Sequence, residues 1–303
     1  MHHTELSLII CSKDRERQLE RCLMALPANE LVACQGELVL VNNASSDQTQ
    51  QVMQEYQQQA SFPVKVIEEP QPGLGRARNT GLRHAEGDVI ILSDDDCYFA
   101  PDYFTKAGNV FDSEEFYFCG GRILPHDLGD ATYGCNFHNT FRLHLAHRAL
   151  DTGVFQGCNL VIHRKVFDRI GEFDESLGAG TPFRSEDVDF CAKAIFAGFA
   201  GAHVPELVVF HHHERRDGLE IERLDEANVY ARGAYYAKWI QRGHVDYLRV
   251  WLRHALSLGK WRRTLTEIRG AWDYWRASKQ PSPEHRLGMP NQQSADKKHR
   301  RAA

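Results

Sequence analysis

The chain lacks the features that mark secreted and membrane-spanning proteins. None of its apolar runs reaches the roughly 18 residues expected of a transmembrane helix. Its eight cysteines include no C-x-x-C pair and no short disulfide framework, and Cys11 and Cys191 lie inside apolar runs. A strand predicted directly after the N-terminus leaves no place for a signal peptide. These absences predict a cytoplasmic protein with reduced, buried thiols.

Two common phosphate-binding motifs are also absent. Gly73-x-Gly75 is followed by Arg78, where a dinucleotide fingerprint needs a third glycine. No G-x-x-x-x-G-K sequence occurs, so other residues must bind phosphate groups. The net charge of −5 gives no general case for nucleic-acid binding. The 303 residues, 42% hydrophobic and 25% charged, are ordinary for a soluble globular protein of one large domain or two small ones.

The first hundred residues predict a doubly wound α/β domain. Apolar, β-branched runs predict strands at 6–11, 37–41, 64–67 and 89–92. The segments between them predict helices over 15–26, from a cap at Ser46 or Asp47 to about 59, and over about 76–84. Strands that alternate with helices form a parallel sheet, and right-handed crossovers place the loops after the strands at one edge.

The rest of the chain is less regular. Strands are predicted at 117–124, 154–163 and 207–210, helices at 165–170 and 185–197, and a helical or loop segment at 127–151. From about residue 219 the pattern is helical, with one helix to about 241 and a second segment over 245–276 that Gly259 ends or kinks. Residues 278–303 are polar and basic and are expected to be disordered.

Asp94, Asp95 and Asp96 directly follow the predicted strand at 89–92. Carboxylates at the end of a buried strand need a counter-charge, and ligands of α/β sheets bind at the carboxyl ends of the strands. Mg²⁺ and Mn²⁺ prefer oxygen ligands, so the triplet fits a metal site that holds a phosphorylated ligand. An acidic, solvated turn or the N-terminus of a helix fits it as well, and the triplet alone leaves both interpretations open.

Other charged groups allow similar alternatives. Arg76 and Arg78 lie near the start of a predicted helix, where arginines either approach a diphosphate or remain solvated. The segment 185–189, Ser-Glu-Asp-Val-Asp, contains either a serine N-cap with acidic first-turn residues or a carboxylate that acts as a general base. His211 and His213 share one face of a strand, as structural histidines or as ligands of metal or phosphate.

Several motifs in a fixed order resemble those of the family 2 glycosyltransferases, which have the nucleotide-diphospho-sugar transferase (GT-A) fold. They are the segments 8–15 and 41–49, the Gly-x-x-x-Ala-Arg-Asn-x-Gly sequence at 73–81, Asp94–Asp96 with Pro101, the segments 157–160 and 171–174, and Glu186-Asp187. The resemblance covers about residues 5–215. It implies a doubly wound, mostly parallel α/β sheet flanked by helices, with a helical C-terminal extension.

The resemblance also implies a division of the chain. Residues 1–215 would form the catalytic domain, with a nucleotide-sugar half at about 1–100 and an acceptor half at about 101–215. Residues 216–277 would form the helical extension and 278–303 the tail.

A donor site for a nucleotide-diphospho-sugar and Mn²⁺ or Mg²⁺ follows from the same resemblance. It implies that the metal ligands are Asp94, Asp96 and His211. The implied donor-binding residues are Ser12, Asp14, Arg15, Asn42, Asp47, Arg76, Arg78, Asn79, Asp94 and Asp95. Asp187, beside Glu186, is implied as the base that deprotonates the acceptor hydroxyl. Asn42 replaces the family's usual aspartate, so a preference for UDP-sugars would rest on an uncharged amide oxygen.

The implied reaction is a single displacement that inverts the anomeric centre and moves a sugar to a saccharide or lipid-linked saccharide. No Gln-x-x-Arg-Trp sequence follows residue 213, which favours a single addition, in surface-polysaccharide or glycolipid synthesis. One alternative is a sugar-phosphate nucleotidyltransferase, although Cys11-Ser12-Lys13-Asp14 poorly matches the glycine- and arginine-rich loop expected there. Another is a non-catalytic nucleotide-sugar binding module, against which the intact acidic motif and Glu186-Asp187 argue.

The segment 245–276 carries an apolar stripe from Trp251 to Trp275 that is flanked by arginines. A basic amphipathic helix with tryptophans can lie on an anionic membrane, which would suit a lipid-linked acceptor and a peripheral location at the inner face of the membrane. Apolar stripes more often pack in a core, so packing on the catalytic domain or on a second subunit of a homodimer is the favoured expectation.

Overall fold

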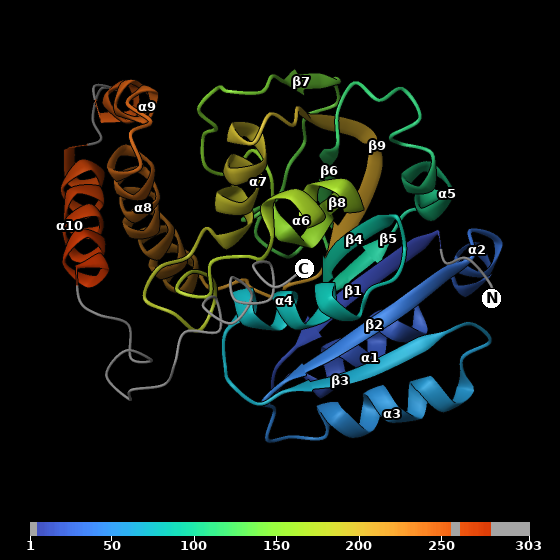
Figure 1. Ribbon diagram of the computed structural model, residues 1–303. Helices are drawn as coiled ribbons and strands as arrows, with labels where there is room; N and C mark the ends of the chain where they lie inside the picture. Colours follow the sequence, from blue (N-terminus) through green and yellow to red (C-terminus); the bar gives the residue numbers. More distant parts are fainter. Residues whose placement is uncertain (1–4, 256–260, 280–303) are drawn as a thin grey trace, which may run out of the picture.

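The computed structural model describes residues 5–255 and 261–279, and its centre is a curved sheet (Figure 1). Within this part of the chain the sheet has nine strands in the order β3-β2-β1-β4-β8-β6-β9-β5, with β7 paired to β9. The strands are β1 (Leu6–Ser12), β2 (Gly36–Asn43), β3 (Val64–Glu69), β4 (Val89–Asp94), β5 (Cys97–Phe99), β6 (Phe118–Pro125), β7 (Arg142–His144), β8 (Leu160–His163) and β9 (Gly201–His211).

Strands β3, β2, β1 and β4 are parallel, which confirms the predicted doubly wound half of the sheet. The helices between them are α1 (Glu16–Met24), α2 (Ala28–Ala33), α3 (Thr49–Gln59) and α4 (Leu74–His84). The parallel register pairs Ser12 with Asn42, and Cys11 with Asp94. Polar residues at the carboxyl ends of β1, β2 and β4 therefore lie side by side at one edge of the sheet.

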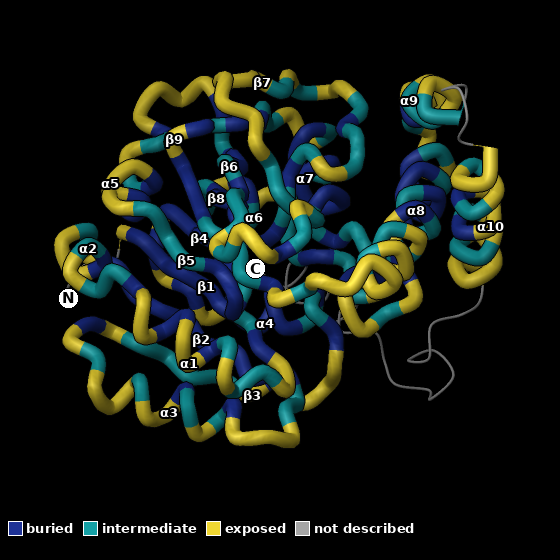
Figure 2. Tube along the Cα trace, turned by 180° about the vertical axis from the view of Figure 1, so that it is seen from behind, coloured by how far each residue is buried: buried dark blue, intermediate teal, exposed yellow. Residues whose placement is uncertain are grey.

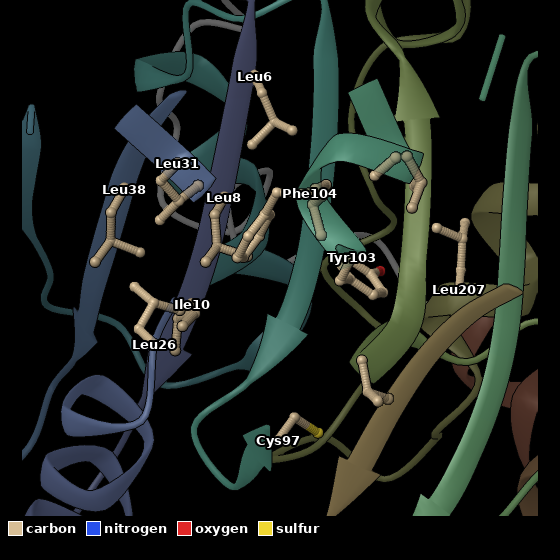
Figure 3. Close-up of a cluster of buried hydrophobic side chains, with 14 of the residues drawn as sticks. Leu6, Leu8, Ile10, Leu26, Leu31, Leu38, Cys97, Tyr103, Phe104 and Leu207 are labelled. Atoms are coloured by element: carbon tan, nitrogen blue, oxygen red, sulfur yellow. The ribbon is translucent and has the colours of Figure 1, made fainter. Parts of the chain in front are cut away.

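Both faces of the parallel strands are covered, so their side chains are apolar in both directions. Leu6, Leu8 and Ile10 of β1 point into the cluster of Figure 3, together with Leu38 and Phe104. Ile9 belongs to the cluster on the opposite face. Figure 2 shows β1, β2 and β4 buried inside the molecule, while the edge strand β3 is only partly buried and the outer sides of the surrounding helices are exposed.

The second half of the sheet differs from the sequence-based expectation. The segment 127–151, expected to be helical or loop, contains the short strand β7. Strand β8 begins at Leu160 instead of 154, because a 3-10 turn over Gly157–Asn159 precedes it. Strand β9 begins at Gly201 instead of 207, because it pairs with β6 along both of their lengths across a shift of register between Gly120 and Arg122.

Three helices flank this half of the sheet: α5 (Tyr103–Gly108), α6 (Arg164–Ile170) and α7 (Glu186–Phe196). The predicted helices at 165–170 and 185–197 are confirmed. Ser185 precedes α7 in a left-handed conformation, and its side chain makes no capping hydrogen bond. Ser185 occupies the N-cap position and acidic residues fill the first turn, as one of the two interpretations had it, but φ of +81° differs from the extended conformation in which a serine side chain caps a helix.

The C-terminal extension consists of α8 (Gly218–Gln241), α9 (Asp246–Ala255) and α10 (Trp261–Ser278) (Figure 1). Helices α8 and α10 touch through Gly233 and Gly270. A Cβ atom on Gly233 would lie 1.8 Å from the carbonyl oxygen of Glu267, so only glycine permits this approach. Gly259 and the predicted tail from 280 onwards lie outside the described residues.

The apolar stripe of α10 does not form this contact. Trp261, Leu265, Ile268, Trp272 and Trp275 recur at helical spacing and are between 37% and 64% exposed. The expected packing on the catalytic domain holds for Trp251, which contacts a core cluster, but not for these residues of α10, because the glycine contact and the buried Glu267 face α8 instead. Packing on a second subunit stays a prediction. Among the residues that the structure describes, none of the helices combines the length and the hydropathy needed to span a lipid bilayer.

Candidate active site

The three aspartates at the end of β4 face different partners. Asp94 is partly exposed and accepts a hydrogen bond of 3.2 Å from Nη2 of Arg78. Asp95 is buried and accepts hydrogen bonds from the Ser12 hydroxyl at 2.5 Å and from Nε of Arg15 at 2.8 Å. The sequence therefore correctly indicates an acidic centre here, and its counter-charges come from helices and loops on both sides of β4.

Asp96 lies between a second nitrogen of Arg15 and the imidazole of His211. Nη2 of Arg15 is 2.5 Å from Oδ2, and Nε2 of His211 is 3.2 Å from Oδ1. Burial lowers the pKa of His211, but the hydrogen bond and the charge of Asp96 outweigh it and raise the pKa to about 9. Burial works against the ionised form of Asp96, yet the same contact with His211 lowers the pKa of Asp96. At neutral pH the two groups form an ion pair.

Asp95 behaves differently because no histidine faces it. Burial raises the pKa of Asp95 to about 7, against the attraction of Arg15, and the charge of Asp96 adds to this rise. One carboxyl of the triplet can therefore hold a proton near neutral pH, which reduces the repulsion among the three aspartates.

Arg78 joins the end of β4 to the start of α7. Its side chain is 3% exposed, and Nη1 lies 2.6 Å from Oε1 of Glu186 while Nη2 reaches Asp94. Burial and then the charge of Asp187 raise the pKa of Glu186 to about 7, although Arg78 opposes the rise. The guanidinium fills the space beside Gly157, where a Cβ atom would lie 2.2 Å from Nη2.

Asp187 is held by backbone groups and remains partly exposed. Its Oδ2 accepts a hydrogen bond of 2.9 Å from the Gly157 N–H, and its Oδ1 accepts one of 2.7 Å from the Val188 N–H. The first turn of α7 thus presents Asp187 beside Arg78, and the 3-10 turn of Gly157 fixes its orientation. A carboxylate that is oriented, ionisable and accessible can accept a proton.

Three predicted donor-binding residues form a network of turns after β1 and β2. The Ser46 N–H donates to Asp14, and Asp47 accepts hydrogen bonds from the Thr49 N–H and hydroxyl. Oδ1 of Asn42 accepts a hydrogen bond from the Ser45 N–H at 3.1 Å. The contact between Asp14 and Ser46 joins the two loops, and the other contacts fix the loop after β2.

The structure does not bring Arg76 and Asn79 into the same group. Arg76 lies 2.6 Å from Glu175 in a half-buried ion pair. Asn79 is fully buried, and its amide binds the backbone N–H and carbonyl of Phe173. Asn79 therefore anchors the segment 171–174 to α4.

The residues around Asp96 fit a divalent metal ion. Ligand atoms of Asp96, Cys97 and His211 lie within 4.8 Å of one another, and the buried Nδ1 of His211 has no hydrogen-bond partner among the described residues. The hydrogen bond with Cys158, together with burial, holds the pKa of Cys97 well above its usual range. Asp96 and His211 are therefore the suitable ligands, and His211 would release its proton when it binds the cation. Asp94 does not belong to this group, because its carboxylate lies on Arg78.

A second group with metal-ligand spacing contains Asp127, Asp130 and His212. Arg216 makes ion pairs with both aspartates, at 3.2 Å to Asp130. Arg15 pairs with Asp96 in the same way, so the arginines do not distinguish the two groups. The difference is the buried Nδ1 of His211, because among the described residues no buried polar side-chain atom of the second group lacks a hydrogen-bond partner.

Two contributions to the site were not predicted from the sequence. The Gly157 N–H orients Asp187, and Gly157 leaves the space for Arg78. Lys238 of α8 binds Asp174 and Asp189, and so ties the C-terminal helices to the loop before α7 and to α7 itself. The glycine at 157 was a visible signal, but its partner is distant in sequence. The lysine gave no signal.

The curved, mostly parallel sheet with helices on both faces matches the GT-A fold of glycosyltransferases. The model of the family described as glycosyl transferase family 2 matches residues 7–171. The chain belongs to this family.

Known relatives agree on the family and differ in what they bind. Glycosyltransferase AglE of Haloferax volcanii is 20% identical over 206 residues, which cover 68% of this chain and 66% of that protein. Mannosyltransferase PcManGT of Pyrobaculum calidifontis, solved with GDP-Man and Mn²⁺, is 19% identical with a TM-score of 0.64, over 93% of this chain and 78% of that one. TarS 1-349 of S. aureus, solved with UDP-GlcNAc, is 18% identical with a TM-score of 0.55, over 90% and 81%. The chain thus spans less than two thirds of AglE.

Proposed function

We propose that the protein is an inverting, metal-dependent glycosyltransferase that adds one sugar from a nucleotide-diphospho-sugar to a hydroxyl group of the acceptor. One observation carries the proposal. The buried guanidinium of Arg78 contacts Asp94 at the end of β4 and Glu186 at the start of α7, so the donor-side carboxylates and the accessible Asp187 flank one fixed positive charge.

The donor would lie along the edge where β1, β2 and β4 end. Ser12, Asp14 and Arg15 would surround its nucleotide from the loop after β1, and Asn42 and Asp47 from the loop after β2. Oδ1 of Asn42 accepts the Ser45 N–H and keeps a second lone pair, and the N–H₂ group of the same amide is a donor. An amide both donates and accepts, so Asn42 suits more than one nucleobase.

Asp96 and His211 would hold Mn²⁺ or Mg²⁺, with Asp94 and Asp95 completing the acidic surroundings. A bound ion would neutralise charge on the diphosphate of the donor. Arg78 would add a second, permanent positive charge, because the neighbouring carboxylates raise its pKa against the effect of burial.

Asp187 would remove the proton of the acceptor hydroxyl. The oxygen then forms a bond to the anomeric carbon as the bond from that carbon to the diphosphate oxygen breaks, and the diphosphate leaves with the electron pair. Attack from the face opposite the leaving group inverts the anomeric configuration. Glu186 would act through Arg78, which it holds in place.

A donor screen tests this proposal. We expect one of the UDP-, GDP- or dTDP-sugars to bind in the presence of Mn²⁺, to hydrolyse slowly, and to bind about tenfold more weakly or worse after EDTA treatment. Isothermal titration calorimetry and nucleotide release measure the two effects. Metal-independent binding would remove the metal from the proposal, binding without turnover would favour a binding module, and pyrophosphate exchange with a nucleoside triphosphate would favour a nucleotidyltransferase.

The exposed stripe of α10 supports a contact with an anionic membrane, at the inner face if the enzyme is cytoplasmic. Tryptophans and aliphatic side chains lie beside Arg262, Arg269 and Arg276 on the same helix. We expect Ile268→Glu to reduce binding to vesicles of phosphatidylcholine and phosphatidylglycerol about tenfold or more, as measured by co-sedimentation. Met24→Glu on α1, where Met24 is 79% exposed, is the matched control. A change in oligomeric state instead of vesicle binding would assign the stripe to a homodimer.

A further inference from the structure

A cavity of about 570 Å³ lies between the loop before α7 and helices α8 and α10. Arg184 of the loop, Arg223 of α8 and Arg269 of α10 line it, and Glu226 is its acidic residue. Three guanidinium groups against one carboxylate give the wall an excess of positive charge. In Figure 1 the loop passes between α8 and the N-terminal end of α4.

These arginines are unlike the arginines of the active site. Arg15 and Arg78 are both held by carboxylates, whereas no ion pair or hydrogen bond joins Arg223 to any described residue. Arg184 has a single contact, at 3.4 Å to Oδ1 of Asn228, and Arg269 lies 3.8 Å from Asp273 on its own helix. The hydroxyls of Thr181 and Tyr230 are already bound within the protein. The Thr266 hydroxyl is bound as well, so the free hydrogen-bond donors among the side chains that line the cavity are the guanidinium groups.

A second, more apolar cavity of about 450 Å³ adjoins the first. The two share Thr181 and Pro182, and the second is lined further by Phe183, Tyr274 and Ala277. A basic hollow next to an apolar one fits a molecule with an anionic head and an apolar chain. Guanidinium groups bind phosphate through paired hydrogen bonds, which gives them a preference for this anion.

The loop that lines both cavities also reaches the active site. The Leu74 N–H at the start of α4 donates to the carbonyl of Ala179 at 3.0 Å, and a Cβ atom on Gly178 would lie 3.2 Å from the Glu186 carboxyl. Arg184 precedes Asp187 by three residues. A ligand in the cavities would therefore touch the segment that leads directly to the residue proposed as the base.

We propose that the two cavities bind the acceptor through a phosphate group that carries an apolar chain. This inference rests on the proposed transferase function, because it names the class of the acceptor. Arg184 and Arg223 bind the phosphate, and the surface of Phe183 and Tyr274 receives the chain. Glu226 opposes a phosphate electrostatically, so the arginines must provide the net attraction.

The test uses the full-length protein and hexyl phosphate as the probe, with inorganic phosphate and hexyl glucoside as comparisons. We expect hexyl phosphate to bind more tightly than either comparison, and the double variant Arg184→Gln/Arg223→Gln to bind it about tenfold more weakly or worse. Arg253→Gln is the matched control, because Arg253 is exposed on α9 and lies outside both cavities. Thermal unfolding checks that each variant is folded.

Equal binding of hexyl phosphate to the wild type and the double variant would overturn the inference. Equal binding of inorganic and hexyl phosphate would remove the apolar cavity from the site and overturn the assigned acceptor class. Binding to vesicles of phosphatidylcholine, with and without phosphatidylglycerol, is measured in parallel. It shows whether the cavities take the phosphate of a soluble ester or that of a lipid headgroup. The double variant can weaken binding to vesicles but not to hexyl phosphate, and Arg253→Gln can weaken vesicle binding to the same extent. In that case the vesicles respond to general surface charge and the inference fails.

The nucleotide-sugar screen is measured separately on the wild type. A protein that binds hexyl phosphate through these arginines but binds no nucleotide-sugar would contradict the transferase proposal alone. A protein that hydrolyses a nucleotide-sugar but shows no arginine-dependent phosphate binding would contradict the acceptor inference alone.

Discussion

Replacing Asp187 by asparagine is expected to lower the turnover of sugar transfer by about 10²–10⁴-fold, the usual contribution of a general base. Asparagine is nearly isosteric, and its carbonyl oxygen can keep one of the two backbone hydrogen bonds that Asp187 accepts. Its amide cannot take up the proton of the acceptor hydroxyl. Binding of the nucleotide-sugar should stay within a few-fold of the wild type, because the carboxylates proposed to lie at the donor are untouched. Turnover and calorimetric titration measure the two quantities.

The control for this substitution is Glu222→Gln, which removes one negative charge from the exposed side of α8, where Glu222 has no part in the site. Its turnover should equal that of the wild type. Unchanged turnover in Asp187→Asn would remove Asp187 as the base. A large loss of donor binding together with a lower melting temperature would show that Asp187 mainly supports the 3-10 turn at Gly157.

The parallel half of the fold could be predicted because its signals are local. The strands β1, β2 and β4 are apolar runs that are buried on both faces. The segments between them carry apolar residues at helical spacing. Their ends were placed too early, since Ser12, Asn43 and Asp94 are polar but still pair with neighbouring strands. Polar residues at the carboxyl edge of a sheet look like a turn in the sequence.

The second half could not be predicted to the same extent because its strands depend on distant partners. Strand β9 pairs with β5, β6 and β7, and residues 201–206 become strand through this pairing although Pro205 interrupts the pattern. The three residues of β7, Arg-Leu-His, are too few for their alternation to indicate a strand. Their conformation comes from the edge that they join.

The acidic triplet Asp94–Asp96 could be identified in the sequence, but not which charged residue contacts each aspartate. Arg15 was expected to bind the donor, and in the structure it binds Asp95 and Asp96. The contacts span 80 and 81 residues, so no local pattern could reveal them. Lys238 was equally hidden, because a lysine within a helix ordinarily indicates an exposed face.

Replacing Lys238 by methionine is expected to lower the free energy of unfolding by roughly 3–5 kcal/mol, the usual effect of removing one partner of a buried ion group. Nζ of Lys238 lies 2.6 Å from Asp174 and 2.7 Å from Asp189, and its side chain is 2% exposed. Among the side chains of residues 5–255 and 261–279, the substitution leaves the buried carboxylate of Asp189 with one hydrogen-bond donor, the Trp239 N–H at 3.1 Å. Urea denaturation followed by circular dichroism measures the loss, and Lys106→Met on the exposed side of α5 is the control.

The dependence of this loss on pH has a definite sign. Although burial opposes it, Lys238 holds the pKa of Asp174 at about 2, below the ordinary 3.8. Asp174 therefore contributes stability above pH 3.8 that disappears as the pH falls toward 2. The difference in the free energy of unfolding between the wild type and Lys238→Met should narrow over this range. In the wild type, protonation of Asp174 removes its attraction to Lys238, and in the variant, protonation of the carboxylates that Lys238 no longer pairs removes their unpaired charge.

A second substitution distinguishes the loss of the attraction to Lys238 from the cost of leaving the Asp189 carboxylate buried and unpaired. In Lys238→Met/Asp189→Asn the buried charge is gone and the asparagine oxygen can still accept the Trp239 N–H, so the double variant should be more stable than Lys238→Met alone. Equal stability of the two variants would show that Asp189 is neutral in the single variant. Since Asp174 lies in the segment that leads to α7 and Lys238 lies on α8, recovery of stability with lowered transfer would mean that this ion group also sets the position of α7, and therefore of Asp187, against the C-terminal helices.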